Sequence, residues 1–204
     1  MNNANLSWLI RNTANIITLT GIFFCQVIKW IIFFHTKWTS GILVFAAGVA
    51  ATDWFDGKVA RFCERKGYAG SVSDFGKAVD RFRDKDFQIT MLLFLLWHPT
   101  VDHPLKWFFC PLVFAEIILL GTLWKEVRKN ADASATNWGK WKMVSECVVI
   151  MACLLIILAR EHGMAVPSYV IFSVLGVLLA ATLFATMSVK GHIANCRRTL
   201  PSLP

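Results

Sequence analysis

Two stretches of this sequence are the most informative about its fold and function: DWFDGKVAR, residues 53–61, and GKAVDRFRD, residues 76–84. Each places two aspartates close together at the end of a segment that is otherwise apolar. Charged side chains in such a setting cost free energy and usually serve a function. The apolar segments therefore predict the fold, and the function is sought in the aspartates that interrupt them, Asp53, Asp56, Asp80 and Asp84.

The amino-acid composition is strongly apolar. Hydrophobic residues make up 56% of the 204 residues, and the mean hydropathy is +0.53. Nine Trp and sixteen Phe against two Tyr add bulky rings that suit a lipid-facing surface and its interfacial belts. A large soluble helical core is the alternative. It is disfavoured because apolar runs near the ~20 residues needed to cross a bilayer recur along the chain.

Six apolar spans are predicted to be transmembrane helices of an all-α, polytopic membrane protein. They cover residues 15–34, 38–62, 76–97, 104–127, 140–159 and 167–189. A short, weakly amphipathic segment around Trp8 and Arg11 precedes the first span. Because the sequence shows no internal repeat and no domain-sized linker, residues 1–204 are expected to form a single membrane domain.

The net charge is +8, and the distribution of the cations predicts the topology. Lys and Arg lie between the apolar runs rather than along an aromatic-interleaved patch, which argues against a nucleic-acid partner. Four of the 21, Lys29, Lys37, Lys106 and Arg160, fall toward the short turns, and the others fall toward the longer loops and the termini. By the positive-inside rule, both termini and the aspartates are expected to be cytoplasmic. The sequence leaves a bacterial inner membrane and an organelle membrane as alternatives.

The aspartates are expected to form two pairs, each on one helical face. At about 100° per residue, Asp53 and Asp56 share a face of their helix. Asp80 and Asp84 are one turn apart on the next helix. Four clustered carboxylates repel one another unless positive charge compensates, and hard divalent cations prefer oxygen ligands. The sequence therefore predicts a pair of Mg²⁺ or Mn²⁺ ions at these residues.

Small residues accompany the aspartates on the same faces. Gly57, Ala60 and Gly76 leave space where a bulky side chain would fill the room above the metals. Arg61 lies just beyond and suits bidentate contacts with a phosphate. This pattern predicts a ligand with phosphate groups beside the metal ions.

An interfacial salt-bridge cluster without metal is the alternative. The cations available for it are Arg61, Arg65, Arg81, Arg83 and Lys85. For any single aspartate, pairing with one of these cations is the simpler interpretation. For the whole set, the small residues at matching spacing favour a metal site.

These residues resemble the signature of the CDP-alcohol phosphatidyltransferases. That signature is an Asp-x-x-Asp-Gly-x-x-Ala-Arg block followed by Gly-x-x-x-Asp-x-x-x-Asp, and every named position is present here. The resemblance implies an enzyme that transfers a phosphatidyl group from CDP-diacylglycerol to an alcohol and releases CMP. It also implies a homodimer, which is usual for relatives of this family.

The resemblance implies roles for individual residues. Metal ligation would fall to Asp53, Asp56, Asp80 and Asp84. Asp84 would also act as the general base on the attacking hydroxyl. The cytidine diphosphate would be bordered by Asp56, Gly57, Ala60, Arg61 and Gly76.

The loop inside the signature is longer than is usual for the family. Fourteen residues, 62–75, separate its two halves. A register at the usual spacing would make Asp74 a ligand, but Ala78 then stands where the last aspartate belongs. We therefore prefer Asp80 and Asp84, with an insertion in the loop.

The start of the fifth span carries a candidate site for the acceptor alcohol. The run Gly139-Lys-Trp-Lys142 resembles an element of phosphatidylglycerophosphate synthases, whose acceptor is glycerol 3-phosphate. Lys140 and Lys142, with Arg128 nearby, would bind a phosphorylated alcohol. Departures from the synthase pattern leave inositol phosphate, inositol, serine or a diacylglycerol-type acceptor as alternatives. Interfacial anchoring is the alternative role for the lysines.

Two functions of other classes compete with this interpretation. A cation transporter also places carboxylates inside a membrane, but here the acidic residues gather at one membrane face. A relative that has lost catalysis and serves as an assembly partner is opposed by the intact aspartates. The acidic residues of the later spans, Glu116 and Glu146, are expected to form satisfied structural pairs.

Overall fold

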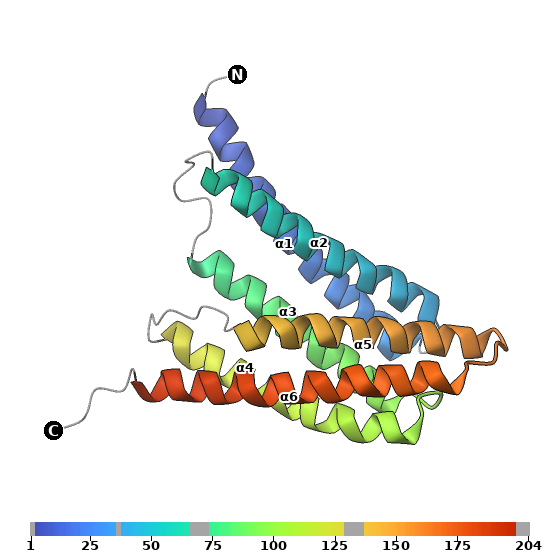
Figure 1. Ribbon diagram of the computed structural model, residues 1–204. Coiled ribbons are helices and arrows are strands. Elements are labelled where there is room, and N and C mark those ends of the chain that lie inside the picture. Colours follow the sequence, from blue (N-terminus) through green and yellow to red (C-terminus); the bar gives the residue numbers. More distant parts are fainter. Residues whose placement is uncertain (1–2, 36–37, 66–73, 129–136, 199–204) are drawn as a thin grey trace. The chain divides into compact units, whose positions relative to one another are not determined.

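Six α-helices make up the computed structural model, which describes residues 3–35, 38–65, 74–128 and 137–198 (Figure 1). The helices are α1 (Asn3–Phe34), α2 (Thr39–Arg65), α3 (Asp74–Trp97), α4 (His103–Arg128), α5 (Asn137–Glu161) and α6 (Ser168–Arg198). Within the described residues every regular element is a helix, so the predicted all-α fold is confirmed.

The first helix differs in one respect from the expectation. The amphipathic segment and the first span form a single helix of 32 residues, α1. Neither proline nor glycine occurs between Asn3 and Thr20, and these are the residues that most readily end a helix. The helix therefore continues without a break into the apolar run.

Four of the described helices contain segments that are long and apolar enough to cross a bilayer. These segments are Ile16–Phe34, His103–Trp124, Asn137–Glu161 and Ser168–Ala194. The helices α2 and α3 have sufficient length, but each concentrates acidic and basic residues in the half that carries the aspartates. The polytopic membrane fold predicted from hydropathy is confirmed.

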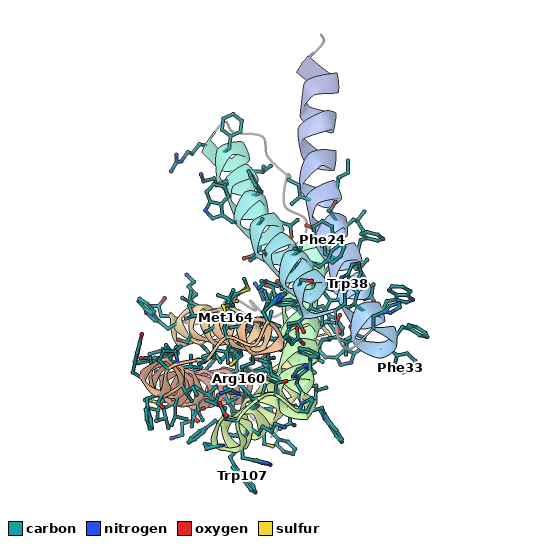
Figure 2. All side chains as sticks on the ribbon, turned by 90° about the vertical axis from the view of Figure 1, so that its right-hand side faces the viewer. Phe24, Phe33, Trp38, Trp107, Arg160 and Met164 are labelled. Atoms are coloured by element: carbon teal, nitrogen blue, oxygen red, sulfur yellow. The ribbon has the colours of Figure 1, made fainter. Side chains whose placement is uncertain are left out.

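Much of the apolar surface of these spans is left uncovered by protein. Only 22% of the span in α1 and 44% of the span in α5 is buried. Phe33 is 80% exposed and Trp107 is 77% exposed, and Figure 2 shows both side chains pointing away from the ribbon. Rings exposed in this way suit contact with lipid chains and the interfacial region.

The chain divides into two compact units, Met1–Asp86 and Phe87–Pro204, with the boundary inside α3. In the first unit α1 packs along α2 (Figure 1). The ring of Phe24 lies so close to Gly48 that a Cβ atom there would come within 2.8 Å of it. Phe24 also meets Phe45 edge-on, with ring centroids 5.6 Å apart. Gly48 therefore allows the close approach of the two helices.

In the second unit α6 packs against both α4 and α5. Its core contains Phe109, Leu154 and Leu178, which are fully buried. At one end of the unit, the guanidinium of Arg160 donates to the carbonyl oxygen of Thr100 at 2.5 Å and to the carboxylate of Asp102 at 2.9 Å. This contact links the end of α5 to the turn before α4.

Candidate metal and active site

Three of the four predicted metal ligands meet in the first unit. Oxygen atoms of Asp53, on α2, and of Asp80 and Asp84, on α3, lie within 4.8 Å of one another. Asp80 and Asp84 lie on one face of α3 because they are separated by one helical turn. Asp53 of α2 lies close to both of them. Hard oxygen donors converging from two helices are a suitable set for Mg²⁺ or Mn²⁺.

The fourth predicted ligand, Asp56, lies on α2 one turn after Asp53. Its side chain is outside the described part of the structure, as are the side chains of Ala60 and Arg61 and the surroundings of Gly76. Gly57 is described and half-buried on α2. The backbone therefore carries all of the predicted cytidine-diphosphate residues on the same two helices as the three aspartates.

Arg83 lies in the middle of the aspartates. Its Nη2 atom is 2.6 Å from Asp80 and 3.0 Å from both Asp53 and Asp84. The Arg83 side chain is only 1% exposed, whereas the exposed fractions of the three carboxylates range from 18% to 40%. The salt-bridge cluster considered as the alternative is thus present, with Arg83 as its cation.

A comparison with protein-family models bears directly on these residues. The model for CDP-alcohol phosphatidyltransferase matches residues 11–188. This range includes every aspartate of the cluster and more than half of the chain.

The chain belongs to the CDP-alcohol phosphatidyltransferase family.

Neither a curated protein nor a solved structure gives a significant match to the chain. Members of the CDP-alcohol phosphatidyltransferase family are phosphotransferases of membranes that use a CDP-alcohol and an alcohol acceptor. They depend in general on divalent metal ions. With its apolar helices, this phosphatidyltransferase family member is an integral membrane protein.

The three residues predicted to bind the acceptor differ from one another in their surroundings. Lys142 is 1% exposed, and its ammonium forms ion pairs with Glu116 of α4 and, at 3.2 Å, with Glu146 of α5. Lys140 is exposed. The side chain of Arg128 lies outside the described residues, at the end of α4. The structural pairing expected of Glu116 and Glu146 is confirmed, and their shared partner is Lys142.

One ion pair beside the aspartate cluster was not predicted. Lys29 of α1 donates to Asp86 of α3 at 2.6 Å and 2.7 Å. The sequence shows the acidic residue, Asp86, two positions after Asp84. It does not indicate the partner, Lys29, which lies 57 residues away in the sequence. The pair is a tertiary contact between α1 and α3, which hydropathy does not specify.

Proposed function

We propose that this protein transfers a phosphatidyl group from CDP-diacylglycerol to glycerol 3-phosphate and releases CMP. The observation that carries the proposal is the convergence of Asp53, Asp80 and Asp84 within 4.8 Å, at the positions of the family signature. This arrangement supports the register in which Asp80 and Asp84, rather than Asp74, are the last two ligands.

The carboxylates would hold two divalent cations, Mg²⁺ or Mn²⁺. Asp53, Asp56, Asp80 and Asp84 offer the hard oxygen ligands that these ions prefer. When bound, the ions neutralise charge on the diphosphate and stabilise the attacking and leaving oxygens. The first unit fits such ions, since oxygen donors of three aspartates already converge there.

Asp84 would accept the proton of the acceptor hydroxyl. The new bond joins that oxygen to the phosphorus that carries diacylglycerol, and the bond that breaks joins this phosphorus to CMP. The side chain of Asp84 is 18% exposed, the least of the three carboxylates. A base shielded from water suits transfer to an alcohol, because water is the competing nucleophile.

The small residues would let the cytidine diphosphate approach the helices. Gly57, Ala60 and Gly76 add no bulky side chain on the faces that carry the aspartates. Arg61 would contact a phosphate oxygen through its planar guanidinium. Asp56 would serve both as a metal ligand and as part of the site for this nucleotide.

Lys140, Lys142 and Arg128 would bind the phosphate of the acceptor. Lys140 is exposed, so its ammonium is accessible to a soluble anion. Lys142 is paired with two glutamates, so binding a phosphate would require an exchange of partners. We expect Lys140→Gln to raise the KM for glycerol 3-phosphate and to leave the KM for CDP-diacylglycerol unchanged.

The proposal includes the setting of the enzyme. The chain would form one domain over residues 1–204 and assemble as a homodimer. Its termini and active site would face the cytoplasm, because most Lys and Arg lie on that side. The membrane would be a bacterial inner membrane or an organelle membrane.

The test measures CMP release from labelled CDP-diacylglycerol by the purified protein. Glycerol 3-phosphate, inositol phosphate, inositol, serine and diacylglycerol are supplied one at a time, with Mg²⁺, Mn²⁺ or EDTA, and the lipid product is identified. We expect phosphatidylglycerophosphate, formed only when metal is present. Another lipid product would correct the acceptor, and no CMP release with any alcohol would refute the proposal.

Two matched variants test the role of Asp84 in the same assay. Asp84→Asn should lower the rate by at least about 10²-fold, as expected for loss of a general base and metal ligand. Asp86→Asn removes the same charge two residues later, where the carboxylate pairs with Lys29. It should retain most of the activity. Normal turnover by Asp84→Asn would remove the base assignment.

A further inference from the structure

Arg83 lies within the metal site on which the proposed function rests, and its position affects metal binding there. One atom, Nη2, lies 2.6–3.0 Å from an oxygen of each of Asp53, Asp80 and Asp84. It therefore occupies the point on which the three carboxylates converge. A Mg²⁺ ion bound to the same oxygens would lie about 2.0–2.1 Å from each of them. The two cations cannot share that point.

The arginine is held in place by more than its charge. Its Nε atom also donates to Asp84 at 3.3 Å. Its other terminal nitrogen, Nη1, is buried and faces α1 at Gly21. A Cβ atom at position 21 would lie 2.9 Å from Nη1 and 3.0 Å from the Cδ atom of Arg83. The absence of a side chain at Gly21 thus provides the space in which the arginine packs.

The charge of Arg83 cannot be relieved by loss of a proton, since a guanidinium stays protonated in proteins. Three carboxylates around one guanidinium leave an excess of negative charge. That excess attracts a divalent cation, while the guanidinium opposes its entry. Removal of the buried guanidinium would leave the carboxylates facing one another without compensation.

We propose that Arg83 is an internal cation that occupies the metal position when the ion is absent and is displaced when the ion binds. Arg83 stabilises the metal-free protein and lowers its affinity for divalent ions. The residue thereby sets the metal concentration at which the site fills.

The test measures Mn²⁺ binding to the purified protein by equilibrium dialysis without substrate, together with the Tm in EDTA and in Mn²⁺. Arg83→Gln should bind Mn²⁺ at least about tenfold more tightly than wild type, because a competing positive charge is gone. Its Tm should fall in EDTA, and Mn²⁺ should raise it more than it raises that of wild type. Unchanged or weaker Mn²⁺ binding by Arg83→Gln would overturn the proposal.

Arg81→Gln is the matched control. It removes the same charge from α3 two residues earlier, outside the three-aspartate cluster, so it reports the long-range effect of charge alone. Its Mn²⁺ affinity should stay within about threefold of wild type, because more distant charges are screened by salt. An increase equal to that of Arg83→Gln would show that net charge, and not occupancy of the metal position, is responsible.

Arg83→Lys covers the case in which Arg83→Gln does not fold. The ammonium keeps the charge on a shorter stem, so it should compete less well, and the variant should bind Mn²⁺ more tightly than wild type. Equal or weaker binding would count against the proposal.

A wild-type protein that binds Mn²⁺ but releases no CMP would refute the proposed function and leave this inference intact. No Mn²⁺ binding by wild type or any variant would overturn the inference.

Discussion

Asp80 lies 2.6 Å from Arg83 in the aspartate cluster, whereas Asp74 is the first residue of α3. The two residues belong to alternative registers of the signature, which the fourteen residues between its two halves, 62–75, make possible. Asp80→Asn should lower the rate by about 10²-fold or more, because a metal ligand is lost. Asp74→Asn should leave kcat close to that of wild type, because Asp74 ligates no metal ion in the preferred register. The reverse pattern of rates would establish the Asp74 register.

Lys142 forms a buried ion cluster with Glu116 and Glu146, and substitution of Lys142 tests how much this cluster stabilises the protein. Lys142→Met should lower the free energy of unfolding by about 3–5 kcal/mol, because Glu116 and Glu146 are then buried without the ammonium between them. Lys140→Met, two residues earlier and exposed, should change it by less than about 0.5 kcal/mol. Thermal unfolding in detergent micelles measures both. Equal stability of the two variants would mean that the Lys142 cluster adds little to the fold.

At the scale of the helices, the contact between α1 and α2 depends on Gly48. A Cβ atom there would come within 2.8 Å of the ring of Phe24, which has no flexible end to move aside. Gly48→Ala should therefore destabilise the protein by about 1–3 kcal/mol, the range found for overpacked cores.

Gly121 of α4 provides the control for Gly48. A Cβ atom at this position meets nothing within 4 Å, so Gly121→Ala should be neutral or stabilise by up to about 1 kcal/mol through helix propensity. Circular dichroism during heating compares the two variants. If both are stabilised equally, the close approach of α1 and α2 does not depend on the missing side chain.

At the scale of the whole molecule, the distribution of Lys and Arg predicts opposite sides for the α5–α6 turn and the C-terminus. His162, exposed in that turn, is replaced by Cys in a variant lacking the native cysteines. A membrane-impermeant maleimide should label it in intact spheroplasts. A second variant that retains Cys196 alone should be labelled only after permeabilisation. Labelling in the opposite order would invert the proposed topology.

The helices and the aspartate spacing were predictable because they depend on local chemistry. Apolar runs near the thickness of a bilayer must satisfy their backbone hydrogen bonds internally, so they form helices. Asp80 and Asp84 share a face because residues one turn apart always do. The same rules failed to predict the length of α1, since a change from weakly amphipathic to apolar sequence does not itself interrupt a helix.

The partners of the charged residues were less predictable. Arg83 was one of five cations that the sequence offered to the aspartates, and the sequence did not distinguish among them. Lys142 was predicted to bind the acceptor, whereas its pairing with Glu116 is a contact between α4 and α5 that the sequence does not specify. Lys29 and Asp86 meet across 57 residues of sequence.

The sequence by itself determined the membrane helices, the family and the faces on which the aspartates lie. Each of these follows from composition, from the spacing of residues within one helix or from the signature. The tertiary structure alone decided that Asp53 meets Asp80 and Asp84 and that Arg83 is the cation among them. Contacts between helices depend on how their surfaces pack. The space beside Gly21 can be assigned to the side chain of Arg83 only when the tertiary structure is known.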